Sequence, residues 1–401
     1  MGFREEVLMR RAEVLQGVRM MKFRSVLDRH ESRELSQLEA AELLGVGERT
    51  FRRWCGRYRE AGEAGLQDRR VGQPAANRVP AEEAARVEVL YRDRYGGFTA
   101  KHFHEHLVRD HGFRWGYTWT KTFLQGRGLL SAAPRRGAHR RKRPRRPLPG
   151  MMLHQDASRH EWVAGQPACD LVVTLDDATS AIYSAILVAE EGTASTMQGL
   201  LEVFTTHGLP CSLYTDRGSH YFMTPKAGGV VDRRALTQVG RALAQLGIEH
   251  IAAYSPEARG RSERAFRTLQ DRLPKELALA GVTTPEAANA YLRETYVPRH
   301  NARFAVAAEQ SGSAFVPAAG IDLHEVLCHQ EERQVGNDNT VVFQRLRLQI
   351  PASPLRAHYV RATVKVRRYQ DGSHAVFHGP RCIGRYDAAG LPCEHAVKQA
   401  A

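Results

Sequence analysis

The sequence predicts a multidomain α/β protein with helical modules at its N-terminal end, a central mixed sheet covered by helices, and a small C-terminal β-barrel. Three observations predict this order. Short helical segments separated by glycines come first, strand and helix patterns alternate from residue 151, and short alternating strands follow residue 336. We therefore expect five segments: 1–75, 76–132, 133–150, 151–320 and 321–401.

The 401-residue chain carries a net charge of +14, and the whole excess lies in its first part. Residues 1–150 hold 32 Lys and Arg against 18 Asp and Glu, whereas residues 151–401 hold 26 of each. This asymmetry predicts a polyanion-binding surface in the front part. We expect no membrane span and no secretory signal, because apolar runs are short and the N-terminus is charged. The six cysteines form no CxxC pair, which indicates a cytoplasmic protein without disulfides or a thiolate zinc site.

The first segment shows two short helices around a glycine turn. Apolar residues from Leu38 to Leu44 recur at helical spacing, and Gly45 is expected to end that helix. On the next helix, from about Glu48, Phe51 and Trp54 are expected to point inward. Four arginines are expected to point outward: Arg49, Arg52, Arg53 and Arg57. This is the helix-turn-helix pattern, which favours DNA binding over a plain solvated hairpin.

A second helical module is expected to follow, with helices over 79–95, from Thr99, and over 117–128. Its exposed basic residues, predicted to contact DNA, are Lys101, Lys121 and Arg127. Four histidines also gather here: His102, His104, His106 and His111. Only two of them share a helix face and no paired cysteines lie nearby, so we expect a surface cluster instead of a zinc site.

The segment 134–150 has eight Lys and Arg, four prolines and no acidic residue. Such a composition cannot form a core, so it predicts an extended, mobile linker. We expect the linker to lie along DNA phosphates, a plain spacer being the alternative. The predicted DNA contacts are Arg140, Arg141, Lys142 and Arg143.

After residue 151, strand and helix patterns follow the order of the RNase H-like fold. Three adjacent strands, the last two joined by the turn DDATS, precede helix, strand, helix, strand and helix. The expected strands lie in MLHQDASRHEWV, ACDLVVTLDD, SAIYSAILVAEE, PCSLYTDRGSHY and IEHIAAY. The last helix is expected to begin at Ser255 as its N-cap, and Pro274 should kink or end it.

Three carboxylates stand at strand ends and on the adjoining late helix: Asp156, Asp216 and Glu263. Phosphodiester cleavage needs an activated attacking oxygen and a neutralised leaving oxygen, which two Mg²⁺ ions provide. Mg²⁺ prefers hard oxygen ligands, so we expect these carboxylates to hold it, with Mn²⁺ as a substitute. Arg267, one turn beyond Glu263, is expected to contact DNA phosphate. Asp176 and Asp177 are the rival first ligands, although their turn favours Asp for backbone reasons.

The chain resembles DDE transposases and retroviral-type integrases, and most closely the ISNCY type of bacterial insertion-sequence transposases. The resemblance rests on the arginine-bearing helix-turn-helix and on HQDAS, DLVVTLDDATSAI, LYTDRGSHY and SPEARGRSERAFRTLQDRL. It implies that Asp156, Asp216 and Glu263 form the catalytic triad of a DNA-cleaving and strand-transferring enzyme. It further implies double-stranded DNA as partner, both terminal repeats and target, with a homo-oligomer on DNA in the bacterial nucleoid. The segment between Asp216 and Glu263 is longer than in integrases, with FMTPKAGGVVDRRA as the insertion.

The C-terminal part shows alternating strands in NDNTVVFQRLRLQI, RATVKVRRYQDGSHAVFHG and RCIGRYD, with a turn at 371–372. These predict the small β-barrel. Its basic residues suit contact with DNA, and a plain solvated face is the alternative: Arg345, Arg347, Lys365, Arg367 and Arg368.

Two other functions are compatible with parts of this pattern. A catalytically inactive helix-turn-helix regulator on the same scaffold would need DNA binding alone, but the intact carboxylates argue against it. An RNase H-type nuclease acting on RNA–DNA hybrids would need no separate DNA-reading modules. No GxxxxGK[ST] loop is present, so no nucleotide cofactor is expected.

Overall fold

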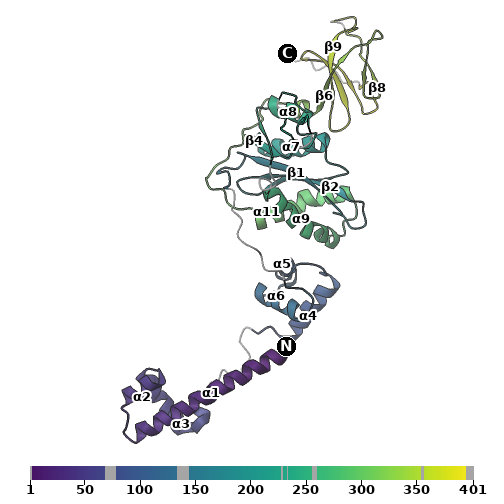
Figure 1. Ribbon diagram of the computed structural model, residues 1–401. Coiled ribbons are helices and arrows are strands. Elements are labelled where there is room, and N and C mark those ends of the chain that lie inside the picture. The colour runs from purple at the N-terminus through teal and green to yellow at the C-terminus, as the bar shows by residue number, and fades with distance from the viewer. Residues whose placement is uncertain are drawn as a thin grey trace. The chain divides into compact units, whose positions relative to one another are not determined.

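The computed structural model describes residues 2–67, 78–132, 144–226, 229–232, 234–254, 260–353 and 356–393. The chain divides into two compact units, Met1–Arg135 and Arg136–Ala401. Among the described residues, the first unit is helical and the second contains the strands (Figure 1).

The first unit begins with three helices, α1 (Gly2–Glu31), α2 (Gln37–Leu44) and α3 (Glu48–Leu66). Ser36 caps α2, since its hydroxyl accepts from the Glu39 N–H while the Glu39 carboxylate accepts from the Ser36 N–H. Gly45 ends α2 in the left-handed conformation with φ of 65°, as predicted. Apolar side chains of all three helices share one core: Phe23, Val26, Leu27, Ala40, Ala41, Phe51 and Cys55.

Three more helices follow where the sequence predicts helices: α4 (Ala81–Asp93), α5 (Ala100–His111) and α6 (Tyr117–Gly126). The Thr99 hydroxyl accepts from the His102 N–H at the start of α5. Phe103, Leu107 and Leu124 are fully buried where α5 and α6 pack.

The expected surface cluster of histidines is wrong for two of its members. His102 is 1% exposed and His106 is 3% exposed. His102 stacks on Phe98 with 4.4 Å between ring centroids, and His106 lies against Tyr95 at 5.1 Å. These imidazole rings pack as flat aromatic groups, which a count of polar residues does not anticipate.

The second unit is built on a five-stranded mixed sheet in the order β3-β2-β1-β4-β5. Its strands are β1 (Leu153–His160), β2 (Cys169–Asp176), β3 (Ile182–Val188), β4 (Ser212–Thr215) and β5 (Glu249–Ala252). The first three pair antiparallel, whereas β1 with β4 and β4 with β5 pair parallel. This order confirms the mixed sheet predicted from the sequence.

Helices cover both faces of this sheet (Figure 1). On one face, α7 (Thr193–His207) and α8 (Gln238–Gln245) bury Leu200, Phe204 and Leu243. On the other, α9 (Gly260–Leu279), α10 (Pro285–Tyr291) and the π-helical turn η2 (Leu292–Tyr296) pack on β2 and β3, followed by α11 (Val297–Phe304). The core therefore lies in two layers around a central sheet.

Helix α9 carries the late part of the predicted site. It continues through Pro274 to Leu279, so the expectation that Pro274 ends the helix is wrong. The apolar stripe of this helix is buried: Phe266, Leu269, Leu273 and Leu277. This packing keeps the residues after Pro274 helical, although proline has no N–H to donate to the helix. The predicted N-cap, Ser255, lies outside the described residues.

The end of the basic linker is held on the sheet, so the expected mobility is wrong for residues 144–150. The Arg145 guanidinium donates to the Asp177 carbonyl at 3.1 Å and to the Ser180 hydroxyl at 2.8 Å. The Arg146 N–H donates to the Asp177 carboxylate at 2.8 Å, and the Gly150 N–H donates to Asp176 at 3.0 Å. The turn after β2 therefore anchors this segment.

The C-terminal strands form a four-stranded antiparallel sheet, β11-β10-β9-β6, and a separate hairpin, β7-β8. The strands are β6 (His329–Gln334), β7 (Thr340–Phe343), β8 (Leu346–Gln349), β9 (Thr363–Arg368), β10 (His374–His378) and β11 (Arg381–Tyr386). Sheet and hairpin share one core that includes Phe343, Leu348, Val366 and Tyr386.

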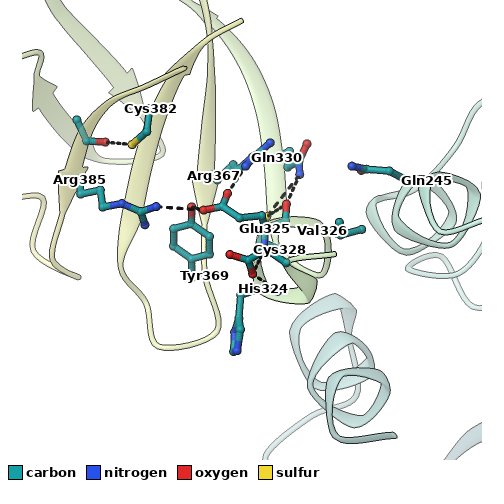
Figure 2. Close-up of polar contacts among 12 residues, drawn as sticks. Gln245, His324, Glu325, Val326, Cys328, Gln330, Arg367, Tyr369, Cys382 and Arg385 are labelled. Carbon is teal, nitrogen blue, oxygen red and sulfur yellow. Dashed lines mark hydrogen bonds and ion pairs between the residues drawn. The ribbon is translucent and has the colours of Figure 1, made fainter. Parts of the chain in front are cut away.

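A short helix, α12 (Leu323–Val326), ties this sheet to the rest of the unit. Glu325 accepts from the Tyr369 hydroxyl at 2.8 Å and from Arg385 at 3.2 Å, and it also pairs with Arg367 (Figure 2). Arg241 of α8 donates to the Cys328 carbonyl at 2.6 Å. These charge-assisted bonds join the C-terminal sheet to the helices of the central sheet.

Over the described part of the chain, the helices are too short or too polar to cross a lipid bilayer.

Candidate active site

Asp156 lies on β1, and Asp216 directly follows β4, its parallel neighbour in the sheet. β1 and β4 pair at Leu153–Leu213 and His154–Tyr214, so each aspartate lies two residues beyond the last pair. Adjacent strands lie about 4.8 Å apart, and this register therefore brings both carboxylates to the same edge of the sheet. Asp156 is 8% exposed and Asp216 is partly exposed.

The loop after β4 orients the Asp216 carboxylate. Its Oδ1 accepts a hydrogen bond from the Gly218 N–H at 2.8 Å, which is an Asx-turn. A Cβ at position 218 would lie 3.1 Å from Asp216 Oδ1 and 3.0 Å from His220 Cε1, so the close approach favours glycine. The turn leaves a ligand role open, because a carboxylate has about four lone-pair sites.

Glu263 lies in the first turn of α9, and its side chain is exposed. Two contacts align this helix with β1. Arg261 pairs with Asp177 at 2.9 Å, beside the start of β1, and Gln270 donates to the Ser158 hydroxyl at 2.9 Å, near its end. The helix therefore runs alongside β1 in the same direction.

This alignment places Glu263 at about the same height along β1 as Asp156, but among the described residues its carboxylate does not form a three-ligand group with Asp156 and Asp216. Seven residues make about two helical turns, so Glu263 shares a helix face with Gln270 and precedes it by about 10 Å. Asp156 precedes Ser158 by about 7 Å along β1. Arg267 is exposed one turn after Glu263, in the position expected for a phosphate contact.

A buried tyrosine connects the acidic groups of this region. The Tyr221 hydroxyl lies 3.3 Å from Gln155 Oε1 and 3.4 Å from Glu191 Oε1. Burial, followed by the negative charges of Glu191, Asp156 and Asp216, raises the pKa of Tyr221 well above its usual value. The phenol stays protonated at neutral pH, and both aspartates act on the same hydroxyl.

Glu191, His220 and Tyr221 are site residues that the sequence reasoning did not include. His220 Nε2 lies 3.5 Å from Glu191 Oε1, and the Glu191 N–H donates to Asp170 at 2.8 Å. The motif TDRGSHY contains His220 and Tyr221, four and five residues after Asp216, and this was the available signal. No sequence signal marked Glu191, because only the fold brings the start of α7 close to the loop that contains His220.

Asp176 and Asp177, the alternative candidates for the first metal ligand, form hydrogen bonds and an ion pair within the fold. Asp177 is 1% exposed and accepts from His154 Nε2 at 2.7 Å, besides its pair with Arg261. Asp176 is fully buried and accepts from the N–H and hydroxyl of Thr179 at 2.8 Å each. These bonds hold the turn after β2 and satisfy both carboxylates, which argues against Asp176 and Asp177 as metal ligands.

The donor set fits a hard divalent cation. Asp156, Asp216 and Glu263 offer carboxylate oxygens, the ligands that Mg²⁺ prefers. The two aspartates and Glu191 place negative charge around one buried phenol, and a bound cation would neutralise part of it. The arrangement suits chemistry on a phosphate group, where charge develops on oxygen atoms.

The predicted DNA-contact residues outside this site fall into three groups. Arg49, Arg52 and Arg53 are exposed on α3, and Arg57 is partly exposed. Lys121 is exposed on α6, whereas Lys101 is half-buried, with Nζ 4.9 Å from the centre of the Tyr117 ring. The four linker residues lie outside the described residues: Arg140, Arg141, Lys142 and Arg143.

Comparisons with known proteins match a domain family and curated relatives that include the two described next. Residues 24–75 match the family described as a helix-turn-helix domain. The chain is 31% identical over 344 residues to the putative transposase y4bF of Sinorhizobium fredii (strain NBRC 101917 / NGR234), across 84% of this chain and 74% of that protein. It is 25% identical over 356 residues to the transposase for insertion sequence IS1202 of Streptococcus pneumoniae, across 80% and 76% respectively.

Solved structures give weaker likenesses. The HTLV-2 integrase catalytic core domain in complex with magnesium (dimeric form) matches 37% of this chain and 89% of that one, with 17% identity and a TM-score of 0.28. The simian T-cell lymphotropic virus intasome in complex with PP2A regulatory subunit B56 gamma matches 77% and 99%, with 13% identity and a TM-score of 0.34.

Proposed function

Because the chain belongs to the transposase family of its relative from Sinorhizobium fredii, we propose that it cleaves DNA at the ends of an insertion sequence and joins the cut ends to target DNA. The observation that supports this proposal is that Asp156 on β1 and Asp216 just after β4 both lie two residues beyond the paired residues His154 and Tyr214, with α9, which carries Glu263, alongside β1. A set of oxygen ligands at one sheet edge suits phosphodiester chemistry and has no evident use in a protein that only binds DNA.

Asp156, Asp216 and Glu263 are the proposed ligands of two Mg²⁺ ions, for which Mn²⁺ can substitute. When bound, these cations help to activate the attacking oxygen and neutralise the leaving oxygen. The chain itself keeps the ligands in place. Asp156 lies within a strand paired on both sides, and the Gly218 N–H orients Asp216. Arg267 on α9 is the proposed contact for a DNA phosphate next to Glu263.

Recognition of the element ends is assigned to the first unit. Its exposed arginines on α3 offer bidentate donors to guanine edges in the major groove. Lys121 and the basic residues 140–143 are proposed phosphate contacts, which add affinity without reading sequence. The double-stranded partner is therefore held by one part of the chain and cut by another.

Finer assignments follow from the same premise. We assign the chain to the ISNCY type of transposases. Its five segments are assigned to two DNA-binding modules, a linker, a catalytic core and a C-terminal β-barrel, which the sheet and the hairpin together close.

Two element ends must be brought together for transposition, so the active species is proposed to be a homo-oligomer on DNA. No nucleotide cofactor is required.

A strand-transfer assay tests this function. Purified full-length protein is incubated with labelled DNA carrying the ends of its element and with unlabelled target DNA. We expect cut ends and joined products with Mg²⁺ or Mn²⁺, and none with EDTA. Specific binding to the ends without cleavage under either metal would contradict the proposal and favour a DNA-binding regulator.

A further inference from the structure

A histidine and a glutamate form a pair beside the proposed ligands, and the transposase chemistry outlined above gives them no role. His220 follows Asp216 by four residues, and Glu191 precedes α7. His220 Nε2 lies 3.5 Å from Glu191 Oε1, with side chains 16% and 24% exposed. The pair is thus mostly buried at the same sheet edge.

One edge of the imidazole ring faces the Asp216 carboxylate. A Cβ at Gly218 would lie 3.0 Å from His220 Cε1 and 3.2 Å from His220 Nδ1, and also 3.1 Å from Asp216 Oδ1. Both groups therefore converge on one point above Gly218. Nε2 is buried on the Glu191 side and makes no hydrogen bond in the described structure. Nδ1 lies on the edge of the ring nearest Gly218.

The charge of the Glu191 carboxylate, 3.5 Å from Nε2, favours the tautomer of His220 that carries its hydrogen on that nitrogen and leaves the lone pair on Nδ1. The same logic operates where a buried carboxylate orients a catalytic imidazole. The Tyr221 hydroxyl, 3.4 Å from Glu191, and the Glu191 N–H bond to Asp170 hold the carboxylate in place.

We propose that His220 is a further catalytic residue, which accepts the proton of the attacking hydroxyl through Nδ1, with Glu191 as its positioning residue. This inference rests on the proposed function. In cleavage, the oxygen of water bonds to phosphorus, its proton passes to Nδ1, and the bond from phosphorus to the 3′-oxygen breaks, with that oxygen taking a proton from solvent to become a 3′-hydroxyl. In joining, the 3′-hydroxyl of the cut end takes the place of water, and the displaced target oxygen takes a proton from solvent.

His250 shows what a purely structural histidine looks like nearby. Its Nε2 bonds to the Thr215 hydroxyl at 3.0 Å and its ring stacks on Phe222 at 4.0 Å. Burial first, and then the charge of His220, lowers the pKa of His250 to about 4. The fold uses both the Nε2 atom and the ring face of His250, whereas no hydrogen bond holds the His220 ring within the described chain.

The test compares His220→Ala, His220→Gln and Glu191→Gln with wild type in single-turnover cleavage of labelled end DNA. His207→Ala is the matched control, since His207 is exposed at the end of α7. We expect the His220 variants to cleave about 10²–10⁴-fold more slowly, the contribution of a general base. Glu191→Gln should be slowed by about tenfold or more, and the control should match wild type.

Two further readouts separate catalysis from structure. DNA affinity and Mg²⁺ affinity, the latter by calorimetry, should stay within about twofold of wild type in His220→Ala. Added imidazole should restore part of its rate, because a small base can fill the vacated space.

Cleavage by His220→Ala within threefold of wild type would overturn the inference, as would a slow variant with weakened Mg²⁺ affinity and no imidazole rescue. Wild type that binds the ends but never cuts them would overturn the proposed function, and this inference with it. Active wild type with inactive Asp216→Asn and fully active His220→Ala would overturn the inference alone.

Discussion

Asp156 on β1 and Asp216, the first residue after β4, each lie two residues beyond the paired residues His154 and Tyr214. The relationship follows from the sheet order, which places β4 directly beside β1 although 60 positions separate the two aspartates. The paired residues just before them fix the backbone at both positions, so this geometry is available before any ligand binds.

The first prediction concerns the proposed ligands. Asp156→Asn, Asp216→Asn and Glu263→Gln should each abolish Mg²⁺-dependent cleavage and joining, since an amide cannot supply the negative charge that a cation requires. DNA binding should remain, because it is assigned to the first unit. The measurements are strand transfer, DNA binding and Mg²⁺ calorimetry on each purified variant.

Asp271→Asn is the matched control on the same helix as Glu263. Asp271 pairs with Lys275 at 2.7 Å and is 37% exposed, so its loss should change stability by less than about 1 kcal/mol and leave cleavage intact. Robust cleavage by Asp216→Asn would contradict the assignment of the ligands.

The strand order was predictable because each central strand has an unambiguous local pattern. DLVVTLD is apolar enough to be buried on both faces, and the turn DDATS separates it from the next strand. The ends of helices were predictable for the same reason, because Gly45 ends α2 and Thr99 begins α5 through hydrogen bonds to residues a few positions away. The proposed positions of Asp156 and Asp216 then follow from topology.

Features that depend on contacts between distant segments were not predictable. Residues 144–150 are held because Asp177, 31 positions after Arg146, binds its N–H, whereas composition alone indicated a mobile segment. Glu191 was missed for the same reason, since nothing in its sequence surroundings marks it as a neighbour of His220.

The second prediction concerns DNA recognition. In the full-length chain, Arg52→Gln and Arg53→Gln should each weaken binding to element ends by about 1–3 kcal/mol, the value of a bidentate contact to guanine. Binding to unrelated DNA should fall less. Arg29→Gln is the control, because Arg29 pairs with Glu34 at 3.3 Å. Fluorescence anisotropy on both DNAs measures the difference; equal losses on both would mean that these arginines contact phosphates only.

The third prediction concerns the linker. Replacing Arg140, Arg141, Lys142 and Arg143 with Gln should reduce the salt slope of DNA binding by roughly 3–4, since each neutralised phosphate contributes about 0.9. Arg145→Gln should leave the slope unchanged, because its guanidinium binds Asp177 and Ser180 within the fold. A salt titration on specific and random DNA measures both. An unchanged slope in the first variant would show that the linker is only a spacer.

The last prediction concerns the buried pair of Asp177 and Arg261, whose side chains are 1% and 11% exposed. Burial alone would raise the pKa of Asp177, but the hydrogen bonds from His154 and the Arg146 N–H, together with the charge of Arg261, outweigh it and lower this pKa. A carboxylate with a lowered folded-state pKa stabilises the fold above its unfolded pKa of about 3.9, and this contribution is lost as pH falls through the folded value.

Asp177→Asn should therefore lower the free energy of unfolding by about 3–5 kcal/mol at pH 7, because it leaves the buried charge of Arg261 without its partner. The difference from wild type should hold down to about pH 4 and shrink below it, as the wild-type carboxylate itself becomes protonated. Urea unfolding at a series of pH values measures this, with Asp271→Asn as the exposed control. A difference of less than 1 kcal/mol at pH 7, or one that stays constant down to pH 3, would show that the Asp177 charge does not hold the linker end and α9 on the sheet.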